Sequence, residues 1–310
     1  MKTVVLTGGL GYSGSVIARR LLERGDRVRT LTNSPDRPSP IAHRLDIRRM
    51  DFADPDALVA AMDGADAFIN TYWVRFNHRL FSFDQAVANT RLLFESARRA
   101  GVPRIVHTSI LKAEQGRGLA YYDGKLRLEQ DLRKLGVSSV IVRPGVLFGR
   151  GDILLNNIAW ALRRLPIFGV FGAGEYKLQP MHVDDFADLV VRAVDGDAPA
   201  VCDAVGPETF SYRDLVALLG RAIGVRRRVV SLPPSVAYAF SRLVGPFVGD
   251  IVITREEIEG LMRGLLFSDS QARGSVRLSE WVRSHSHELG VRYASELGRR
   301  TDRAAAYTRL

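Results

Sequence analysis

Thr7-Gly8-Gly9-Leu10-Gly11-Tyr12-Ser13-Gly14 is the stretch of sequence that decides the fold. It follows an apolar run, Thr3 to Thr7, that predicts a β-strand, and it opens a segment, Ser13 to Arg24, whose pattern predicts a helix. Small residues at these positions let the turn tighten, let backbone amides approach a diphosphate, and let the helix pack on the sheet. Because many turns contain three glycines, the inference depends on their position between a strand and a helix. In that position they predict a dinucleotide site, with Gly8, Gly11, Tyr12, Ser13 and Gly14 as its contacts.

The first half of the chain alternates short apolar runs with helical patterns, which is typical of βαβ units and a parallel sheet. Several predicted helices end at a glycine, where a left-handed residue closes a helix at low cost. The further predicted strands are Arg27 to Thr32, Ala67 to Asn70, Arg104 to Thr108 and Ser139 to Arg143, and the further helices are Pro55 to Met62, Phe81 to Ala100 and Tyr121 to Leu135. The sequence therefore predicts an α/β fold with a Rossmann-type, doubly wound parallel sheet.

The rhythm of the sequence changes after Gly149-Arg150-Gly151-Asp152. A predicted apolar helix, Ile153 to Leu165, is followed by a glycine-rich stretch, and from Phe210 onward the pattern is largely helical. We expect residues 1–150 and 176–205 to form the dinucleotide-binding domain. Residues 151–175 and 206–310 are expected to form a smaller, mostly helical substrate lobe.

The 310 residues carry a formal net charge of +10, which suits nucleic acid, an anionic membrane surface or acidic substrates as partners. The cations are scattered arginines without a nucleic-acid-binding module, so we expect no nucleic-acid function. The apolar segment Ser235 to Ile253 is interrupted by Arg242 and Asp250 before it reaches the length of a membrane span. We expect a buried helix pair there, with attachment to a membrane surface as the alternative.

Cysteine usage and the amino-terminal residues bear on the compartment. The single cysteine, Cys202, excludes an internal disulfide framework, and no cysteine and histidine residues have metal-ligand spacing. We therefore expect no metal site. Met1 and Lys2 lead directly into the first predicted strand, without the charged and apolar segments of an export signal. The expected location is cytoplasmic.

The spacing G-x-x-G-x-x-G resembles that of the short-chain dehydrogenase/reductase superfamily, whereas other dehydrogenases have G-x-G-x-x-G. Within the superfamily, the chain is similar to extended or atypical members of the NAD-dependent epimerase/dehydratase type. It is close in pattern to the group that includes the NAD(P)H-binding accessory subunit of respiratory complex I. The resemblance covers the first two hundred residues well and the tail poorly, and its supporting stretches are Asn70 to Phe76, Asp152 to Trp160 and Gln179 to Asp185.

The resemblance implies a bound NAD or NADP, between which the end of the second strand normally selects. This strand ends at Thr32-Asn33-Ser34 without a carboxylate for the ribose hydroxyls, which favours NADP. Asn33, Ser34 and Arg37 are candidate phosphate contacts, although Arg37 could instead be a solvated loop charge. The further cofactor contacts that the resemblance implies are Asp51 and Phe52 beside the adenine, Asn70 and Thr71 in the groove, Thr108, Lys125, and Pro144 near the nicotinamide. Asp51 could instead cap the helix that begins near Pro55.

Tyr121 and Lys125 form the candidate catalytic pair, because residues four apart share one face of a helix. A free phenol has a pKa of about 10, which a neighbouring ammonium and a positive nicotinamide would lower. The phenolate could then take a proton from a substrate alcohol while hydride leaves to the cofactor, and the reverse reaction would protonate a reduced carbonyl. Tyr122 is the alternative if the motif is phased differently.

The resemblance implies a serine or threonine at the end of the predicted strand Arg104 to Thr108, and Ser109 is the candidate for an oxyanion-type contact. The interval from Ser109 to Tyr121 is shorter than in typical extended members, so Ser109 could instead cap the strand end. Trp73 and Arg75 follow the predicted strand Ala67 to Asn70, at the carboxyl edge where ligands bind, and are the candidate substrate contacts.

These residues predict an NAD(P)-dependent oxidoreductase or epimerase that acts on a small-molecule alcohol, a carbonyl or a nucleotide sugar. One alternative is an NAD(P)H-binding redox sensor or assembly protein with little catalysis. The other is a membrane-peripheral quinone or lipid reductase. A monomer and a homodimer fit the sequence equally.

Overall fold

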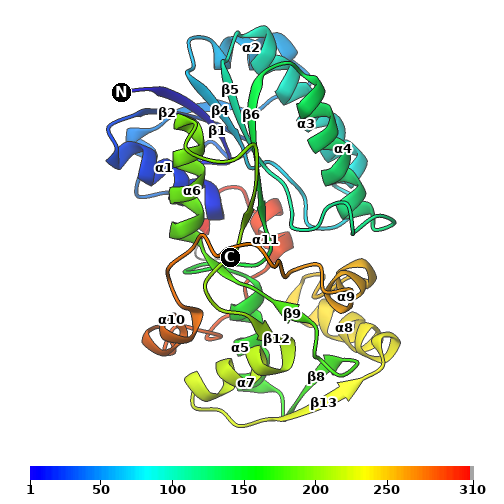
Figure 1. The fold of residues 1–310 in the computed structure, drawn as a ribbon. Helices are drawn as coiled ribbons and strands as arrows, with labels where there is room; N and C mark the ends of the chain where they lie inside the picture. Colours follow the sequence, from blue (N-terminus) through cyan, green and yellow to red (C-terminus); the bar gives the residue numbers. More distant parts are fainter. Residues whose placement is uncertain (308–310) are drawn as a thin grey trace. The chain divides into compact units, whose positions relative to one another are not determined.

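The computed structural model describes residues 1–307 and divides into two compact units (Figure 1). The first unit consists of Met1–Pro144 and Phe186–Ala204. The second consists of Gly145–Asp185 and the chain from Val205 onward. The domain division expected at residues 150, 175 and 205 stays a prediction about functional organisation.

A seven-stranded parallel sheet forms the centre of the first unit, in the order β11-β6-β5-β4-β1-β2-β3. The chain builds outward from β1 to β2 and β3, then returns to the other side of β1 to build β4, β5 and β6. This reversal next to β1 is the switch point of a doubly wound sheet, so the predicted Rossmann-type fold is confirmed. The strands are β1 (Thr3–Thr7), β2 (Arg27–Thr32), β3 (Asp46–Arg49), β4 (Ala67–Asn70), β5 (Arg104–Thr108), β6 (Ser138–Pro144) and β11 (Val201–Ala204).

Helices cover both faces of this sheet (Figure 1). One face carries α1 (Tyr12–Glu23) and α6 (Val183–Asp195), which are joined by ion pairs from Arg20 to Asp188 at 3.0 Å and from Arg24 to Asp195 at 2.5 Å. The other face carries α2 (Pro55–Met62), α3 (Phe83–Arg99) and α4 (Ala120–Lys134). The buried apolar faces of these helices and strands form the core of the unit, with Phe68, Phe94, Ile105 and Leu128 among its residues.

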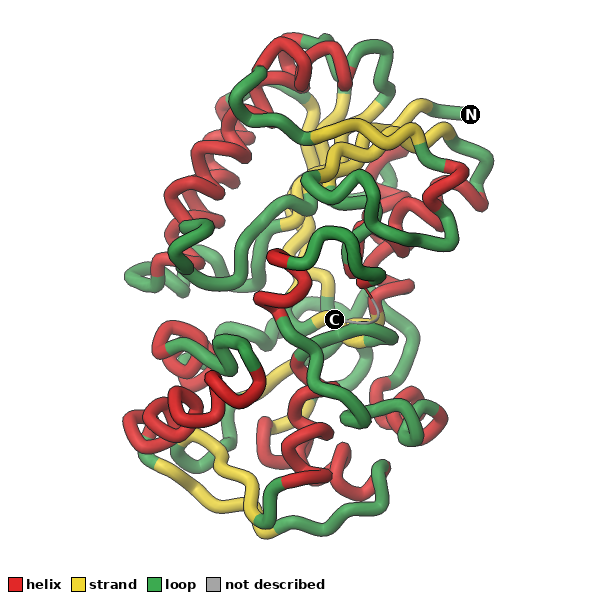
Figure 2. The backbone as a smooth tube through the Cα atoms, turned by 180° about the vertical axis from the view of Figure 1, so that it is seen from behind, coloured by secondary structure: helices red, strands yellow, loops and turns green. Residues whose placement is uncertain are grey.

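In the second unit more residues lie in helices than in strands, and the strands form short pairs, as the view from behind shows (Figure 2). The parallel pairs are β7 (Leu147–Phe148) with β10 (Met181–His182), and β8 (Ile167–Phe171) with β13 (Arg228–Leu232). The antiparallel pair is β9 (Lys177–Leu178) with β12 (Phe210–Ser211). The helices are α5 (Leu154–Arg164), α7 (Tyr212–Ala222), α8 (Pro234–Val248), α9 (Arg255–Met262), α10 (Leu278–Ser284) and α11 (Glu296–Thr301).

The expected buried helix pair at Ser235 to Ile253 is wrong. The segment forms one helix, α8, followed by a non-helical stretch from Gly249 to Ile253, and several of its large apolar side chains are exposed. Within residues 1–307, no helix combines the length and the apolarity that a membrane crossing requires. The cytoplasmic location stays a prediction.

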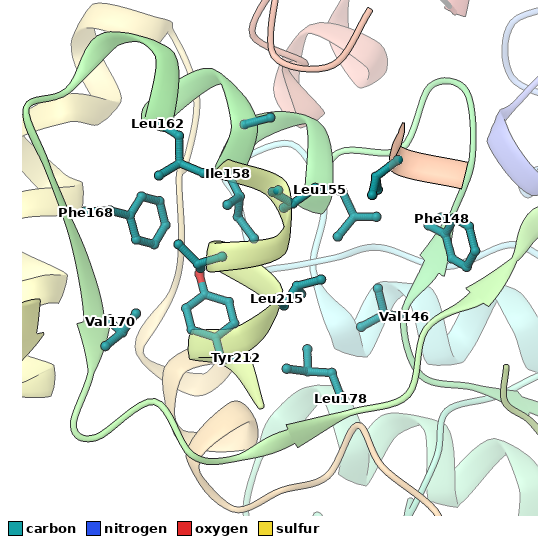
Figure 3. Close-up of a cluster of buried hydrophobic side chains, with 14 of the residues drawn as sticks. Val146, Phe148, Leu155, Ile158, Leu162, Phe168, Val170, Leu178, Tyr212 and Leu215 are labelled. Carbon is teal, nitrogen blue, oxygen red and sulfur yellow. The ribbon is translucent and has the colours of Figure 1, made fainter. Parts of the chain in front are cut away.

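A large apolar cluster lies in the second unit (Figure 3). Helix α5 contributes Leu155, Ile158 and Leu162, and α7 contributes Tyr212 and Leu215, which point toward one another. Phe168 and Val170 of β8 close the cluster from the side. The helical periodicity of α5 and α7 therefore has a direct structural cause, since each presents one apolar stripe to the other.

We expect Leu215→Ala to lower the free energy of unfolding by about 2–5 kcal/mol, because the side chain is fully buried and its removal leaves a cavity. Urea unfolding followed by circular dichroism measures the change. Leu80→Ala is the control, since Leu80 is 62% exposed and its loss should change stability by less than about 0.5 kcal/mol. Equal effects of the two substitutions would show that this cluster does not stabilise the fold.

Candidate functional site

The turn between β1 and α1 is built from backbone that leaves no room for side chains. Gly8 has φ +70°, its amide donates to Leu31 O at 2.9 Å, and its carbonyl accepts from the Gly11 amide at 2.8 Å. A Cβ atom on Gly14 would lie 2.1 Å from the oxygen of Gly8. Glycine at positions 8 and 14 is therefore a steric requirement of this turn.

This turn delivers the amino terminus of α1 to the carboxyl end of β1. The N-cap residue is Gly11, and α1 has neither a side-chain cap nor an acidic residue in its first turn. The first amide groups of a helix lack intrahelical acceptors, and the helix dipole favours negative charge there. The residues present therefore fit a diphosphate, with Tyr12 and Ser13 at the opening of the helix.

A buried polar network supports the turn from below. The Thr71 amide donates to Thr7 Oγ1 and its hydroxyl donates to Thr7 O, both at 2.7 Å, so the ends of β1 and β4 are tied together. Asn70 is fully buried and bridges Thr7 Oγ1 (3.2 Å) and His107 Nδ1 (3.0 Å). Burial lowers the pKa of His107 well below its ordinary value, so the ring is neutral. Thr71 thus lies against the turn, whereas Asn70 lies beneath it.

The loop after β2 holds the three candidate phosphate contacts. Asn33 and Ser34 are half-buried, and the Arg37 amide donates to Ser34 O at 3.2 Å, which folds the loop back on itself. Arg37 is only 5% exposed. The alternative that it is a solvated loop charge is therefore wrong.

The residues expected beside the adenine are Asp51 and Phe52. Asp51 is exposed and accepts a hydrogen bond from the Ala53 amide at 3.0 Å. Asp54, and not Asp51, caps α2 by accepting from the Ala57 amide at 2.9 Å, so the alternative role for Asp51 is wrong. The Phe52 ring lies 5.2 Å from that of Tyr72, which forms an apolar wall after β3.

Lys125 is a buried cation at the carboxyl end of β5. Its Nζ donates to Thr108 O at 2.7 Å and lies 4.5 Å from the centre of the Trp73 ring. The side chain is 2% exposed, and burial lowers its pKa to about 7, against an opposing effect of the Glu129 carboxylate. A lysine with this pKa exchanges protons near neutral pH.

Tyr121 lies one helical turn before Lys125, in a group of aromatic rings. It meets Trp73 edge-on at 5.8 Å and Phe83 at 5.7 Å. A Cβ atom on Gly124 would lie 2.8 Å from the Trp73 ring, so a glycine between the catalytic candidates admits the indole. Tyr121 and Lys125 therefore share one face of α4, and both contact Trp73.

Three further candidates have the following surroundings. Tyr122, the alternative to Tyr121, is buried, and its ring occupies the space that a Cβ atom on Gly116 would need. The Arg75 guanidinium lies 5.7 Å from the centre of the Phe76 ring. Pro144 ends β6, and its carbonyl accepts from the Leu111 amide at 3.0 Å.

Ser109 belongs to an ion-pair network that the sequence did not reveal. Its hydroxyl donates to Glu129 Oε1 at 2.5 Å, and Glu129 is completely buried. Arg143 pairs with the same carboxylate through Nε at 2.8 Å and through a second nitrogen, which also contacts Glu114 at 2.6 Å. The hydroxyl of Ser109 is therefore engaged by Glu129. The spacing of Tyr121, Lys125 and Glu129, each four residues apart on α4, was the signal that could have found Glu129.

Within residues 1–307, no three histidine, cysteine, aspartate or glutamate side chains gather in a way that could hold a metal ion.

We expect Lys125→Met to stabilise the protein more at low pH than at high pH. Between about pH 7 and the ordinary value of 10.5, the unfolded chain keeps a proton on Lys125 that the folded chain has lost. Over that range, this residue makes the free energy of unfolding rise by about 1.4 kcal/mol per pH unit. Below that range, the folded protein bears the full cost of a buried ammonium. The advantage of the variant over the natural chain should thus be largest near pH 6 and shrink toward about pH 9 in urea unfolding.

Lys134→Met is the matched control, because Lys134 is an exposed lysine at the end of the same helix. Its effect on stability should not change with pH. A pH-independent effect of Lys125→Met would contradict the burial of a charge at this position.

Known proteins resemble this chain in sequence and in fold. Residues 8–153 match the model of a family described as NAD(P)H-binding. The chain is 23% identical over 282 residues to NADH dehydrogenase (ubiquinone) 1 alpha subcomplex subunit 9, mitochondrial, of Arabidopsis thaliana. The aligned region spans 85% of this chain and 70% of that protein. It is 25% identical over 236 residues to a ceramide reductase of Caulobacter vibrioides, which spans 74% of this chain and 73% of the reductase.

The fold is shared with a solved structure of an NADPH-dependent quinone oxidoreductase from Escherichia coli in complex with NADPH. The two superpose with a TM-score of 0.75 at 22% identity, over 91% of this chain and 99% of the oxidoreductase. The resemblance predicted from the glycine spacing is confirmed, as is its implied cofactor, NAD or NADP. The residues that match this family model, 8–153, include the glycine turn and Lys125.

Proposed function

We propose that the protein is an NAD(P)H-dependent reductase that transfers hydride to a small, apolar carbonyl compound or quinone. The observation that carries this proposal is the buried Lys125 ammonium, one helical turn from Tyr121, at the carboxyl edge of the sheet that also carries the glycine turn. Trp73, Tyr121 and Phe83 surround this position with aromatic rings, which suits an apolar substrate. The names of the quinone oxidoreductase and the ceramide reductase agree with substrates of this kind.

Each residue of the site would have a separate role in this reduction. The glycine turn would hold the diphosphate, and Lys125 would hold the ribose of the nicotinamide end. When bound, NAD(P)H would supply the hydride that reduces the ketone or quinone. Tyr121 would donate its phenolic proton to the carbonyl oxygen, and the positive charge of Lys125 would stabilise the phenolate that remains. Trp73, beside both, would exclude water from the reacting atoms.

Ser109 takes a different part in this proposal from the one expected. A contact with the substrate oxygen would require its hydroxyl to leave the Glu129 carboxylate at 2.5 Å, an acceptor that is stronger than a carbonyl. We therefore assign Ser109 and Glu129 to positioning the end of β5 against α4. Arg75 stays a candidate substrate contact.

We also propose that NADPH is preferred over NADH. The end of β2 lacks a carboxylate for the ribose hydroxyls, and the buried Arg37 stands with Asn33 and Ser34 in the loop that follows. The affinity of each nucleotide, measured by titration calorimetry, tests this preference.

A second candidate function is nucleotide binding without turnover. It is supported by the Ser109 hydroxyl, which is bound to the Glu129 carboxylate and so is not available to a substrate oxygen. The similarity to a subunit of a respiratory complex over 85% of the chain agrees with an assembly role. An epimerase is a third outcome, which the stoichiometry separates: a reductase consumes one NAD(P)H per product, whereas an epimerase returns the hydride within each cycle.

We expect Tyr121→Phe to lower the turnover number by about 10²- to 10⁴-fold, because it removes the proton donor, and to leave the dissociation constant of NADPH nearly unchanged. Oxidation of NADPH with a panel of quinones and apolar ketones measures the change. Tyr122→Phe is the matched control and should keep its activity. Full activity of Tyr121→Phe would defeat the assignment, and loss in Tyr122→Phe alone would transfer the role to Tyr122. Absence of turnover in the natural chain, with tight NADPH binding, would favour the second candidate.

We expect Gly14→Ala to abolish nucleotide binding, since its Cβ atom would lie 2.1 Å from Gly8 O and force the turn apart. Titration calorimetry with NADPH should show a dissociation constant raised by more than about 100-fold, the scale of about 3 kcal/mol. Gly64→Ala is the control. Its φ of +66° makes alanine costly for stability, but no atom lies within 4 Å of the added Cβ, so nucleotide affinity should persist. Unchanged affinity of Gly14→Ala would remove the glycine turn from the site.

A further inference from the structure

Helix α8 presents its large apolar residues to solvent. Val236 and Phe240 are each 50% exposed, Leu243 is 69% exposed and Phe247 is 91% exposed. They stand at intervals of four, three and four residues, so they form one stripe along a single side of the helix. The stripe is about 16 Å long at 1.5 Å per residue.

The opposite side of α8 carries small residues that face the protein. The buried positions are Ala237, Ser241 and Gly245, again four apart. A Cβ atom on Gly245 would lie 2.9 Å from Asp250 O, so this side fits closely against the chain that follows. A surface helix normally buries its large apolar residues and exposes its polar ones, and α8 inverts that pattern. Its exposed stripe is therefore expected to be covered by an apolar partner.

The segment that leads into and out of α8 carries more cations than anions. Residues 226–255 contain five arginines, at positions 226, 227, 228, 242 and 255, and one acidic residue, Asp250. Asp250 is buried and accepts hydrogen bonds from the amides of Glu296 and Leu297 at 2.8 and 3.1 Å. Arg242 is exposed and stands between Phe240 and Leu243 in the sequence. Acidic residues resume in α9, where Glu257 closes the capping box and Glu259 pairs with Arg263 at 3.5 Å.

The size and charge of this surface select its partner. Even at about 200 Å² for each large apolar side chain, four partly exposed residues fall short of the roughly 800 Å² per partner that a stable protein interface buries. Like charges would also face each other in a contact between two copies. A bilayer needs no such area, because it takes up apolar side chains individually, and anionic headgroups attract arginine.

We propose that α8 docks the second unit onto the surface of an anionic lipid bilayer, with Val236, Phe240, Leu243 and Phe247 inserted among the lipids. Arg242, an exposed arginine of the same helix, meets the lipid phosphates. The docking is independent of the reductase chemistry. Where both hold, the enzyme meets apolar substrates at the membrane in which they dissolve.

Vesicle flotation of the full chain tests this docking. The vesicles contain phosphatidylcholine with or without about one third phosphatidylglycerol, at low and high salt. We expect the chain to float with anionic vesicles, more weakly at high salt, and to stay behind with neutral ones. Leu243→Ser with Phe247→Ser should lower the partition coefficient by about 10- to 100-fold, because each side chain contributes apolar area. Leu80→Ser, an exposed leucine of the first unit, should have no effect.

A fluorescent probe at position 247 tests whether the exposed stripe itself enters the bilayer. The natural cysteine, Cys202, is 3% exposed, so an environment-sensitive thiol dye on Phe247→Cys labels one site in the folded protein. Its emission should shift to the blue with anionic vesicles and return when salt is raised. Circular dichroism and NADPH affinity report whether each variant is folded. Flotation that survives loss of both apolar residues, no flotation of the natural chain, or a dimer that dissociates on Leu243→Ser with Phe247→Ser would each overturn the proposal.

Discussion

The contact between Gly8 and Gly14 is the constraint on which the rest of the site depends. The Gly8 oxygen lies 2.1 Å from the position that a Cβ atom of residue 14 would take, so the turn from β1 to α1 requires a glycine at residue 14. That close approach fixes the helix start at the edge of the sheet, and Thr7 then fastens the end of β4 through two hydrogen bonds from Thr71. The carboxyl edge thus has a set geometry before any ligand arrives, which is the preorganisation that binding requires.

The burial of Lys125 destabilises the folded protein, because the charged side chain loses its contact with water. One carbonyl oxygen and one indole ring stabilise the Lys125 ammonium less than water would, and this loss of solvation lowers its pKa. Glu129, one turn further along α4, offsets part of the cost while its own charge is neutralised by Arg143. Groups kept under such strain concentrate at functional sites, where a shifted pKa serves proton transfer.

The sequence predicted those parts of the fold whose cause is local. The bounds of β1, β2, β4 and β5 are as predicted, because each is a short segment with buried apolar or β-branched residues. The bounds of β3 were missed, since Asp46-Ile47-Arg48-Arg49 is a charged edge strand with no apolar pattern. The strand pairs of two residues in the second unit are too short to carry a period.

The candidate site also has parts that the sequence predicts and parts that only the folded structure shows. The glycine turn and the spacing of Tyr121 and Lys125 are patterns within one element. The partners of Glu129 come from positions 109 and 143, on other elements, so only the folded chain brings them together. Trp73 was predicted at the edge of the sheet, but its place over Lys125 depends on Gly124, which spacing alone does not relate to it.

Helix α8 shows how average composition can mislead where periodicity would not. The mean apolarity of Ser235 to Ile253 predicted burial, because it treats alanine, glycine, leucine and phenylalanine as one class. Read every fourth residue, the same segment separates into Ala237, Ser241 and Gly245 on one side and the large residues on the other. Small residues permit close packing of a helix, whereas large residues supply the apolar area that drives transfer from water. The large apolar residues, whose transfer out of water is the more favourable, are the ones that α8 leaves exposed. This reversal makes the exposed side of α8 a contact surface for a lipid bilayer.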